Sequence, residues 1–178
     1  LKQAWVYRYG TGIVPQGDQG LDYRFEVTPL MIGGILYIST PTSPARPDLK
    51  ATITALRPET GEVLWKYESP LNIHGRGLAY WGGDAGHPPR VIFATDKGMV
   101  AAVDVTTGKP VKGFGRDGMI DAYIGVVSER VGETRRETFT VPNPVTVWKN
   151  LFFTTSRPGE VGPPGPRGDI RAWDTRTG

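Results

Sequence analysis

The sequence predicts an all-β fold in which four-stranded units repeat, as in the blades of a β-propeller. Three segments end in the same Thr-Gly pair, and each is a strand-like run containing alanine that leads into a polar turn. The pairs are Thr60-Gly61, Thr107-Gly108 and Thr177-Gly178. The first two lie about 45 residues apart, which is the length that four short strands and their turns require. No long helical period accompanies them, so the repeat indicates propeller blades.

Composition narrows the function classes. The chain has 178 residues, with 24 glycines and 16 prolines, as expected for many turns and loops. Its net charge is only +3, and its basic residues are scattered, which argues against nucleic-acid binding. It contains no cysteine and therefore no disulfide. No apolar run approaches the roughly 18 residues of a membrane span.

The first part of the chain predicts one complete blade. Segment 4–10 is typical of the outer strand of a preceding blade. Two apolar runs around Gly33-Gly34 predict a hairpin, and two more around Pro58-Glu59-Thr60-Gly61 predict a second one. We expect the four strands at 24–32, 35–40, 52–56 and 63–67.

Two further blades follow in the same order. We expect strands of the second blade at 77–81, 91–95 and 99–104, and then a long loop with short irregular strands over 113–138. The third blade is expected at 140–148 and 151–155, with a turn at Lys149-Asn150. The Pro- and Gly-rich stretch 157–168 predicts a loop before a strand near 169–174.

Three blades do not close a ring, because a closed propeller needs at least four. The repeat also stops at Gly178, at a turn after which another strand is expected. We therefore expect residues 1–178 to form an incomplete propeller domain of a longer protein that continues beyond Gly178.

The repeat resembles that of a known family. The pattern Ala-x-x-x-x-Thr-Gly-x-x-x-Trp, complete from Ala55 to Trp65, resembles the tryptophan-docking repeat of the quinoprotein dehydrogenases. These enzymes use pyrroloquinoline quinone (PQQ) in an eight-bladed propeller, so the resemblance implies about three blades of such a ring. Segments 26–30, 76–81 and 167–172 extend the likeness over essentially the whole chain.

The likeness is strongest to the quinoprotein glucose dehydrogenase branch. Methanol and alcohol dehydrogenase relatives carry two adjacent cysteines shortly before the residue that matches Arg76. This chain has Pro70-Leu71-Asn72-Ile73 at that place and no cysteine at all.

The resemblance implies cofactor contacts for several polar residues. PQQ is a planar tricarboxylate with an ortho-quinone, and a guanidinium can pair two of its oxygens, so Arg76 matches a cofactor-binding arginine. Glu26 matches a glutamate beside the cofactor, and His74 a histidine that donates to it. Asn143 and Thr140 are further candidates for polar contacts. The alternatives are an arginine paired with a carboxylate on the surface, a solvent-facing strand glutamate and a structural histidine.

A divalent cation, Ca²⁺ or Mg²⁺, is also implied, with oxygen ligands. Glu160 lies at the place comparable to a metal-ligating glutamate of the family, and its alternative role is that of a solvated loop carboxylate. The catalytic base is expected beyond Gly178, because Asp104 and Asp174 belong to repeat turns, where a carboxylate caps backbone amides.

Packing between blades is the role expected for Trp65, and the same is expected for Trp5 and Trp148. In the second copy of the repeat, Phe114 lies near the tryptophan position. Trp81 follows the Arg76 motif, so it is a candidate for shaping the cofactor cavity.

The resulting hypothesis is a dehydrogenase that oxidises a sugar or alcohol hydroxyl by hydride transfer to PQQ. Its electrons would pass to ubiquinone or cytochrome c, in the periplasm, with association to the inner membrane through segments outside this chain. These residues alone are expected to be inactive. The alternative is a non-enzymatic propeller of the same repeat family, serving as a scaffold in outer-membrane protein assembly.

Overall fold

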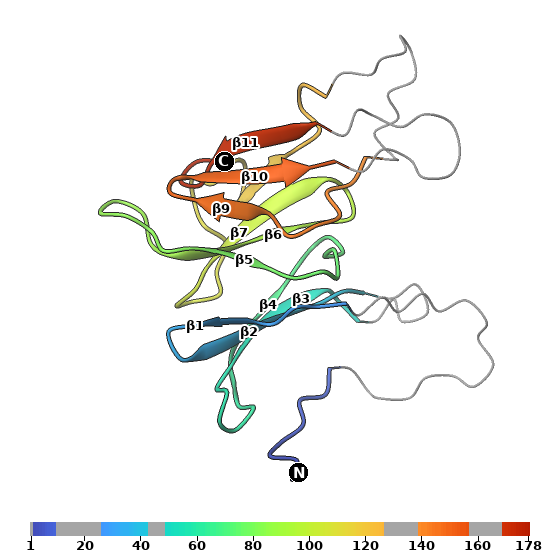
Figure 1. Ribbon diagram of the computed structural model, residues 1–178, viewed down its shortest axis with the longest axis vertical. Helices are drawn as coiled ribbons and strands as arrows, with labels where there is room; N and C mark the ends of the chain where they lie inside the picture. Colours follow the sequence, from blue (N-terminus) through green and yellow to red (C-terminus); the bar gives the residue numbers. More distant parts are fainter. Residues whose placement is uncertain (1, 10–25, 43–48, 127–138, 157–168) are drawn as a thin grey trace, which may run out of the picture.

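A computed structural model describes residues 2–9, 26–42, 49–126, 139–156 and 169–178 (Figure 1). Within these ranges the chain forms eleven β-strands and no helix. The predicted all-β class is therefore confirmed. None of the described residues forms a helix long and apolar enough to cross a membrane.

The first sheet is an antiparallel meander of four strands in the order β1-β2-β3-β4. Gly33 and Gly34 both have positive φ, at 56° and 78°, as the tight turn of its first hairpin requires. The strands predicted at 35–40, 52–56 and 63–67 agree with the structure within about one residue. The first strand, predicted at 24–32, is shorter than expected, because only Leu30–Ile32 pair with β2. The strands are β1 (Leu30–Ile32), β2 (Ile35–Thr40), β3 (Thr52–Leu56) and β4 (Val63–Glu68).

The second sheet repeats this arrangement in the order β5-β6-β7-β8. Its fourth strand lies in the stretch predicted to be a loop with short irregular strands, where it pairs with the start of β7. The strands are β5 (Ala79–Trp81), β6 (Arg90–Ala94), β7 (Met99–Asp104) and β8 (Met119–Asp121).

The third sheet has three described strands in the order β11-β10-β9. Lys149 has a φ of 52° in the turn between β9 and β10, where a two-residue hairpin was expected. The strands are β9 (Thr146–Trp148), β10 (Leu151–Thr155) and β11 (Ile170–Asp174).

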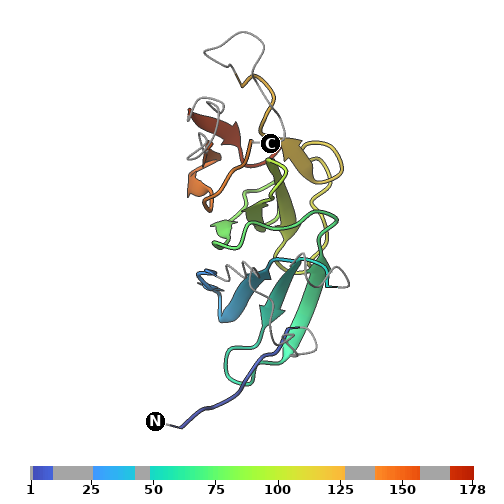
Figure 2. The ribbon, with the colours of Figure 1, turned by 90° about the vertical axis from the view of Figure 1, so that its right-hand side faces the viewer.

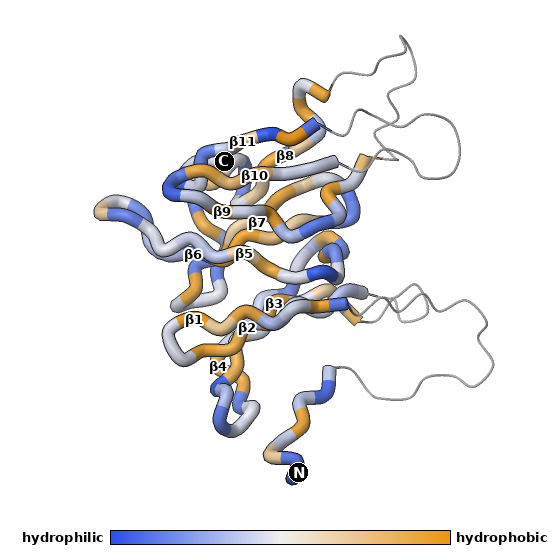
Figure 3. The backbone as a smooth tube through the Cα atoms, viewed as in Figure 1, coloured by the Kyte–Doolittle hydropathy of each residue, from blue (hydrophilic) through white to orange (hydrophobic). Residues whose placement is uncertain are grey.

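The sheets are arranged one after another along the long axis of the molecule (Figures 1 and 2). One apolar core contains residues of the first and second sheets, such as Ile53 and Phe93, and another joins the second and third, such as Val100 and Phe152. All five residues of β6 are buried. Many of the strands contain apolar stretches, whereas several turns are hydrophilic (Figure 3).

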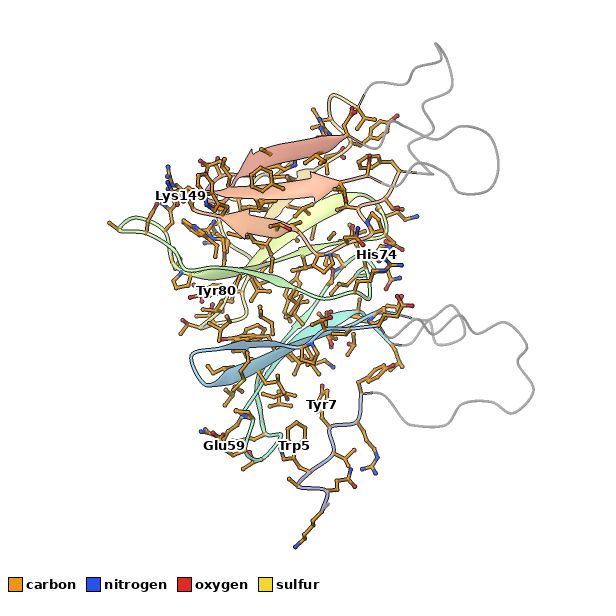
Figure 4. All side chains as sticks on the ribbon, viewed as in Figure 1. Trp5, Tyr7, Glu59, His74, Tyr80 and Lys149 are labelled. Atoms are coloured by element: carbon orange, nitrogen blue, oxygen red, sulfur yellow. The ribbon has the colours of Figure 1, made fainter. Side chains whose placement is uncertain are left out.

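Tryptophan docking joins the first and second blades as expected. The indole nitrogen of Trp65, in β4, donates a hydrogen bond of 2.9 Å to the carbonyl oxygen of Val105 after β7. Trp5 donates one of 2.8 Å to the carbonyl oxygen of Pro58 in the first sheet, and Figure 4 shows it beside this turn. The outer strand predicted at 4–10 is not formed: its described residues, 4–9, are in no strand, although Trp5 docks on the first sheet.

The other aromatic predictions need correction. Trp148 does not dock between the three described blades: its side chain is 58% exposed, with the Lys149 ammonium 4.5 Å from its ring centre. Phe114, near the tryptophan position, packs between the second and third sheets, where it is fully buried beside Phe152 of β10. The side chain that lies against the Gly178 turn is instead Ile120. Trp81 lies in the core rather than on a cavity, with the guanidinium of Arg90 4.8 Å from its ring.

Carboxylate caps at the repeat turns are confirmed. Asp104 accepts hydrogen bonds from the backbone amides of Thr106 and Thr107, at 2.9 and 2.8 Å. Asp174 does the same for the turn after β11. Both carboxylates therefore have a local structural role, as the sequence indicates.

Candidate functional site

Three short segments lead into the first strand of each sheet, and they meet at one place. We call 26–29, 76–78 and 143–145 the lead-in segments of β1, β5 and β9. Thr28 and Gly77 form a parallel β-bridge, so the first two run side by side. A Cβ atom on Gly77 would lie 3.2 Å from the Thr28 carbonyl oxygen and 3.5 Å from a ring carbon of Pro144. The absence of a side chain at Gly77, where φ is 127°, therefore permits this close approach.

Arg76 links all three lead-in segments through its side chain. Its Nε atom lies 3.4 Å from a carboxylate oxygen of Glu26, and its Nη1 donates a hydrogen bond of 3.2 Å to the side-chain oxygen of Asn143. We call these three residues the Arg76 cluster. All three are predicted from the sequence as cofactor contacts, and the structure brings them together from the lead-in segments of three different sheets.

The Arg76 cluster is open to solvent and rich in hydrogen-bonding groups. The side chains of Arg76 and Glu26 are 44% and 55% exposed. Among the described residues, none accepts a hydrogen bond from Nη2 of Arg76. Two N–H donors of a charged group are therefore available to a ligand that carries oxygen atoms, such as a carboxylate.

His74 helps to shape the backbone that presents Arg76. Its amide donates to the carbonyl oxygen of Ala94, at 3.0 Å, and its own carbonyl accepts from the amide of Arg76, at 2.9 Å. The side chain is partly buried, and Figure 4 shows it on the opposite side of the sheets from Lys149. A tight turn anchored on β6 thus places Arg76 at the start of its lead-in segment.

Asn72 is a site-supporting residue that sequence reasoning missed. Its side-chain oxygen accepts a hydrogen bond of 2.7 Å from the backbone amide of Thr42, and its carbonyl accepts one from the amide of Asp96. It therefore ties the first sheet to the β6–β7 turn just before His74. The signal that could have found it is its place in segment 70–73, directly before His74 and Arg76.

Of the two remaining candidates, only Thr140 is described by the structure, and it does not join the Arg76 cluster. Thr140 lies between Phe139 and Val141, which are both buried in the core, and it forms no hydrogen bond to the Arg76 cluster among the described residues. Glu160 lies outside the described residues. Within the described part of the chain, no group of three His, Cys, Asp or Glu side chains is placed to hold a metal ion.

These features define a β-propeller with a polar site where the first strands of successive blades begin. A sequence model of the PQQ-dependent family, described as the β-propeller domain of glucose, ethanol and alcohol dehydrogenases, matches residues 1–178. The chain therefore belongs to the PQQ-dependent quinoprotein dehydrogenase family.

The named relatives of this chain differ in the substrate that they oxidise. The chain is 31% identical to the dehydrogenase subunit of an alcohol dehydrogenase (quinone) from Acetobacter aceti, over 86% of this chain and 18% of that protein. It is 28% identical to quinate/shikimate dehydrogenase (quinone) from Acinetobacter baylyi and 25% identical to quinoprotein glucose dehydrogenase from Escherichia coli. Both matches cover 100% of this chain and 23% of the relative. The chain thus spans about a fifth of the length of these relatives.

Solved structures agree on the fold. Quinohemoprotein alcohol dehydrogenase from Comamonas testosteroni superimposes with a TM-score of 0.61 at 23% identity, covering 86% of this chain and 20% of that one. A europium-containing methanol dehydrogenase superimposes with a TM-score of 0.56 at 21% identity, covering 84% and 23%. At these identities the likeness supports the propeller architecture alone.

Proposed function

We propose that this chain is part of a PQQ-dependent dehydrogenase that oxidises a hydroxyl group of a sugar or alcohol. The Arg76 cluster is the observation that carries the proposal, because it places a cationic donor where three blades converge. Bound PQQ would supply the two-electron acceptor for the substrate hydride. The family relationship supports the same reaction class.

The residues present suit a planar tricarboxylate. Arg76 would donate to carboxylate or carbonyl oxygens of PQQ from its Nη2 group, while Glu26 and Asn143 hold its other nitrogens. His74, two residues earlier, is proposed to donate to another cofactor oxygen. The side chains of Arg76 and Glu26 are exposed enough to be reached by a ligand from solvent.

The family relationship leads us to propose a bound divalent cation, Ca²⁺ or Mg²⁺. The described residues, however, include no group of three His, Cys, Asp or Glu side chains that could hold this ion. The proposed ligand, Glu160, lies outside them. We therefore assign the metal no step here, and the base that deprotonates the substrate is expected from other blades of a longer propeller.

The sequence of residues 70–73 supports a sugar as the substrate more than a simple alcohol. They contain no cysteine at the place where alcohol-oxidising relatives carry their adjacent pair. An aldose is thus the proposed substrate, with alcohols as the second candidate. We further propose the periplasm as the compartment and ubiquinone or cytochrome c as the electron acceptor, with membrane association through segments outside this chain.

The test is substrate-dependent dye reduction by the full-length protein reconstituted with PQQ and Ca²⁺ or Mg²⁺. We expect reduction with aldoses only after PQQ is added, and none with the apoprotein. The absence of PQQ-dependent reduction across aldoses and alcohols would contradict the proposal. If PQQ also fails to bind, the scaffold function in outer-membrane assembly becomes the better explanation.

A further inference from the structure

We infer that Asn143 is a positioning residue, which acts on the cofactor through Arg76 instead of contacting it. This inference rests on the proposed function. The sequence offered Asn143 only as a direct polar contact. The structure gives its side-chain oxygen a different partner, because that atom accepts the hydrogen bond from Nη1 of Arg76.

Two contacts fix the orientation of the guanidinium group. Glu26 holds Nε, and Asn143 holds Nη1 from a different lead-in segment. Because the group is planar, holding two of its nitrogens removes the rotation that a single contact would leave free. Nη2 of Arg76 then points in one direction, and less rotational freedom is lost when a ligand binds.

The backbone around Asn143 is suited to this task. It lies between Pro142 and Pro144, whose rings restrict the backbone on both sides. Val141 and Val145, one residue further out, are buried at 1% and 4% exposure. The ring of Pro144 also approaches Gly77, the neighbour of Arg76. An exposed amide is thus held on a rigid and well-anchored segment.

The charge of the cluster explains why an amide suits this position. Glu26 already supplies one carboxylate to Arg76. A second carboxylate at position 143 would make the cluster net negative and would repel an anionic ligand. The neutral oxygen of Asn143 orients the guanidinium and leaves its charge available to PQQ.

A double-mutant cycle on PQQ affinity tests this inference. The dissociation constant would be measured by titrating PQQ into the full-length apoprotein, for the wild type, Asn143→Ala, Arg76→Ala and the double variant. We expect about tenfold weaker binding for Asn143→Ala and about 100-fold for Arg76→Ala, as for hydrogen bonds to charged groups. The double variant should bind like Arg76→Ala alone, because Asn143 has no effect without its partner.

Multiplicative losses in the double variant would overturn the inference, since they would mean that Asn143 contacts the cofactor independently. Unchanged affinity in Arg76→Ala would instead contradict the proposed cofactor site itself. Asn150→Ala, in the β9–β10 turn, is the matched control and should leave the affinity unchanged. If Asn143→Ala lowers the folded fraction, Asn143→Leu repeats the cycle at similar side-chain volume.

Discussion

The indole ring of Trp65 lies on the backbone of Gly108, in the turn that follows the middle strands of the next blade. A Cβ atom at Gly108 would be 2.5 Å from the ring, and φ there is +66°. The Thr-Gly pair of the repeat is therefore explained physically. Glycine is required both for the left-handed backbone and for the space that the tryptophan occupies.

Gly108→Ala should destabilise the protein by about 2 kcal/mol or more, because it combines an unfavourable backbone conformation with a steric clash. The free energy of unfolding in urea is the measurement. Gly86→Ala is the control: a Cβ at Gly86 would meet nothing within 4 Å, and a change below about 0.5 kcal/mol is expected. Equal effects of the two substitutions would show that Trp65 does not constrain the turn.

The two tryptophans Trp65 and Trp148 should differ sharply on truncation. Trp65→Ala removes the docking contact and the hydrogen bond to Val105, and should cost about 3 kcal/mol. Trp148→Ala removes a side chain that is 58% exposed, and should cost less than about 1 kcal/mol. Unfolding midpoints of the two variants measure the difference. A larger loss for Trp148→Ala would contradict the assignment of docking residues.

Arg90 joins the second and third blades from inside the core. Its side chain is fully buried, and Nη1 donates to the carbonyl oxygens of Thr175 and Arg176, at 3.1 and 2.9 Å. Burial lowers the pKa of its guanidinium from the ordinary value. Arg90→Met keeps an unbranched apolar stem but leaves both carbonyls without this donor, so we expect a loss of about 3 kcal/mol.

Arg57→Met is the matched control for Arg90→Met. Arg57 pairs with Glu62 on the exposed surface, at 2.9 Å, and the loss of such a pair typically costs less than about 1 kcal/mol. Urea unfolding of both variants makes the comparison. Similar costs for the two substitutions would mean that Arg90 does not hold the third blade in place.

The stability of the folded protein should decrease as the pH is lowered, because Asp84 then becomes protonated. Hydrogen bonds from the His87 ring and the Gly86 amide, together with Arg176, hold the pKa of this carboxyl below its ordinary value of 3.8. A lowered folded-state pKa means that the contribution is present above the ordinary value and is lost as pH falls through the lowered one. Thermal midpoints at about pH 6 and about pH 3 should differ less in Asp84→Asn than in the wild type. An unchanged difference would contradict this role.

Sequence patterns predicted most of the fold because its strands are marked by local signals. Gly33-Gly34 and the Thr-Gly pairs fix the turns, and apolar runs between them fix the strands. The short strand Met119–Asp121 was harder to recognise, because only its pairing with β7 distinguishes it from a charged loop. Trp148 was misassigned for a related reason: exposure depends on the neighbouring sheet, which a local pattern does not report.

The candidate site was predicted in part. The resemblance named Arg76, Glu26 and Asn143, but the order in sequence could not show that Asn143 holds Arg76 across 67 positions. Asn72 was missed because its contact with Thr42 also joins separate blades. Contacts between blades depend on how the sheets stack, so they required the structure.

The central claim is that Arg76 presents a cofactor-binding group where three blades meet. A crystal structure of the full-length protein with PQQ bound tests it most directly, through the distances between Arg76 Nη2 and the cofactor oxygens. We predict a separation of about 2.7–3.2 Å to a carboxylate or carbonyl oxygen, with Glu26 and Asn143 still on the other two nitrogens. PQQ bound elsewhere, with no oxygen in hydrogen-bonding contact with Arg76, would contradict the account.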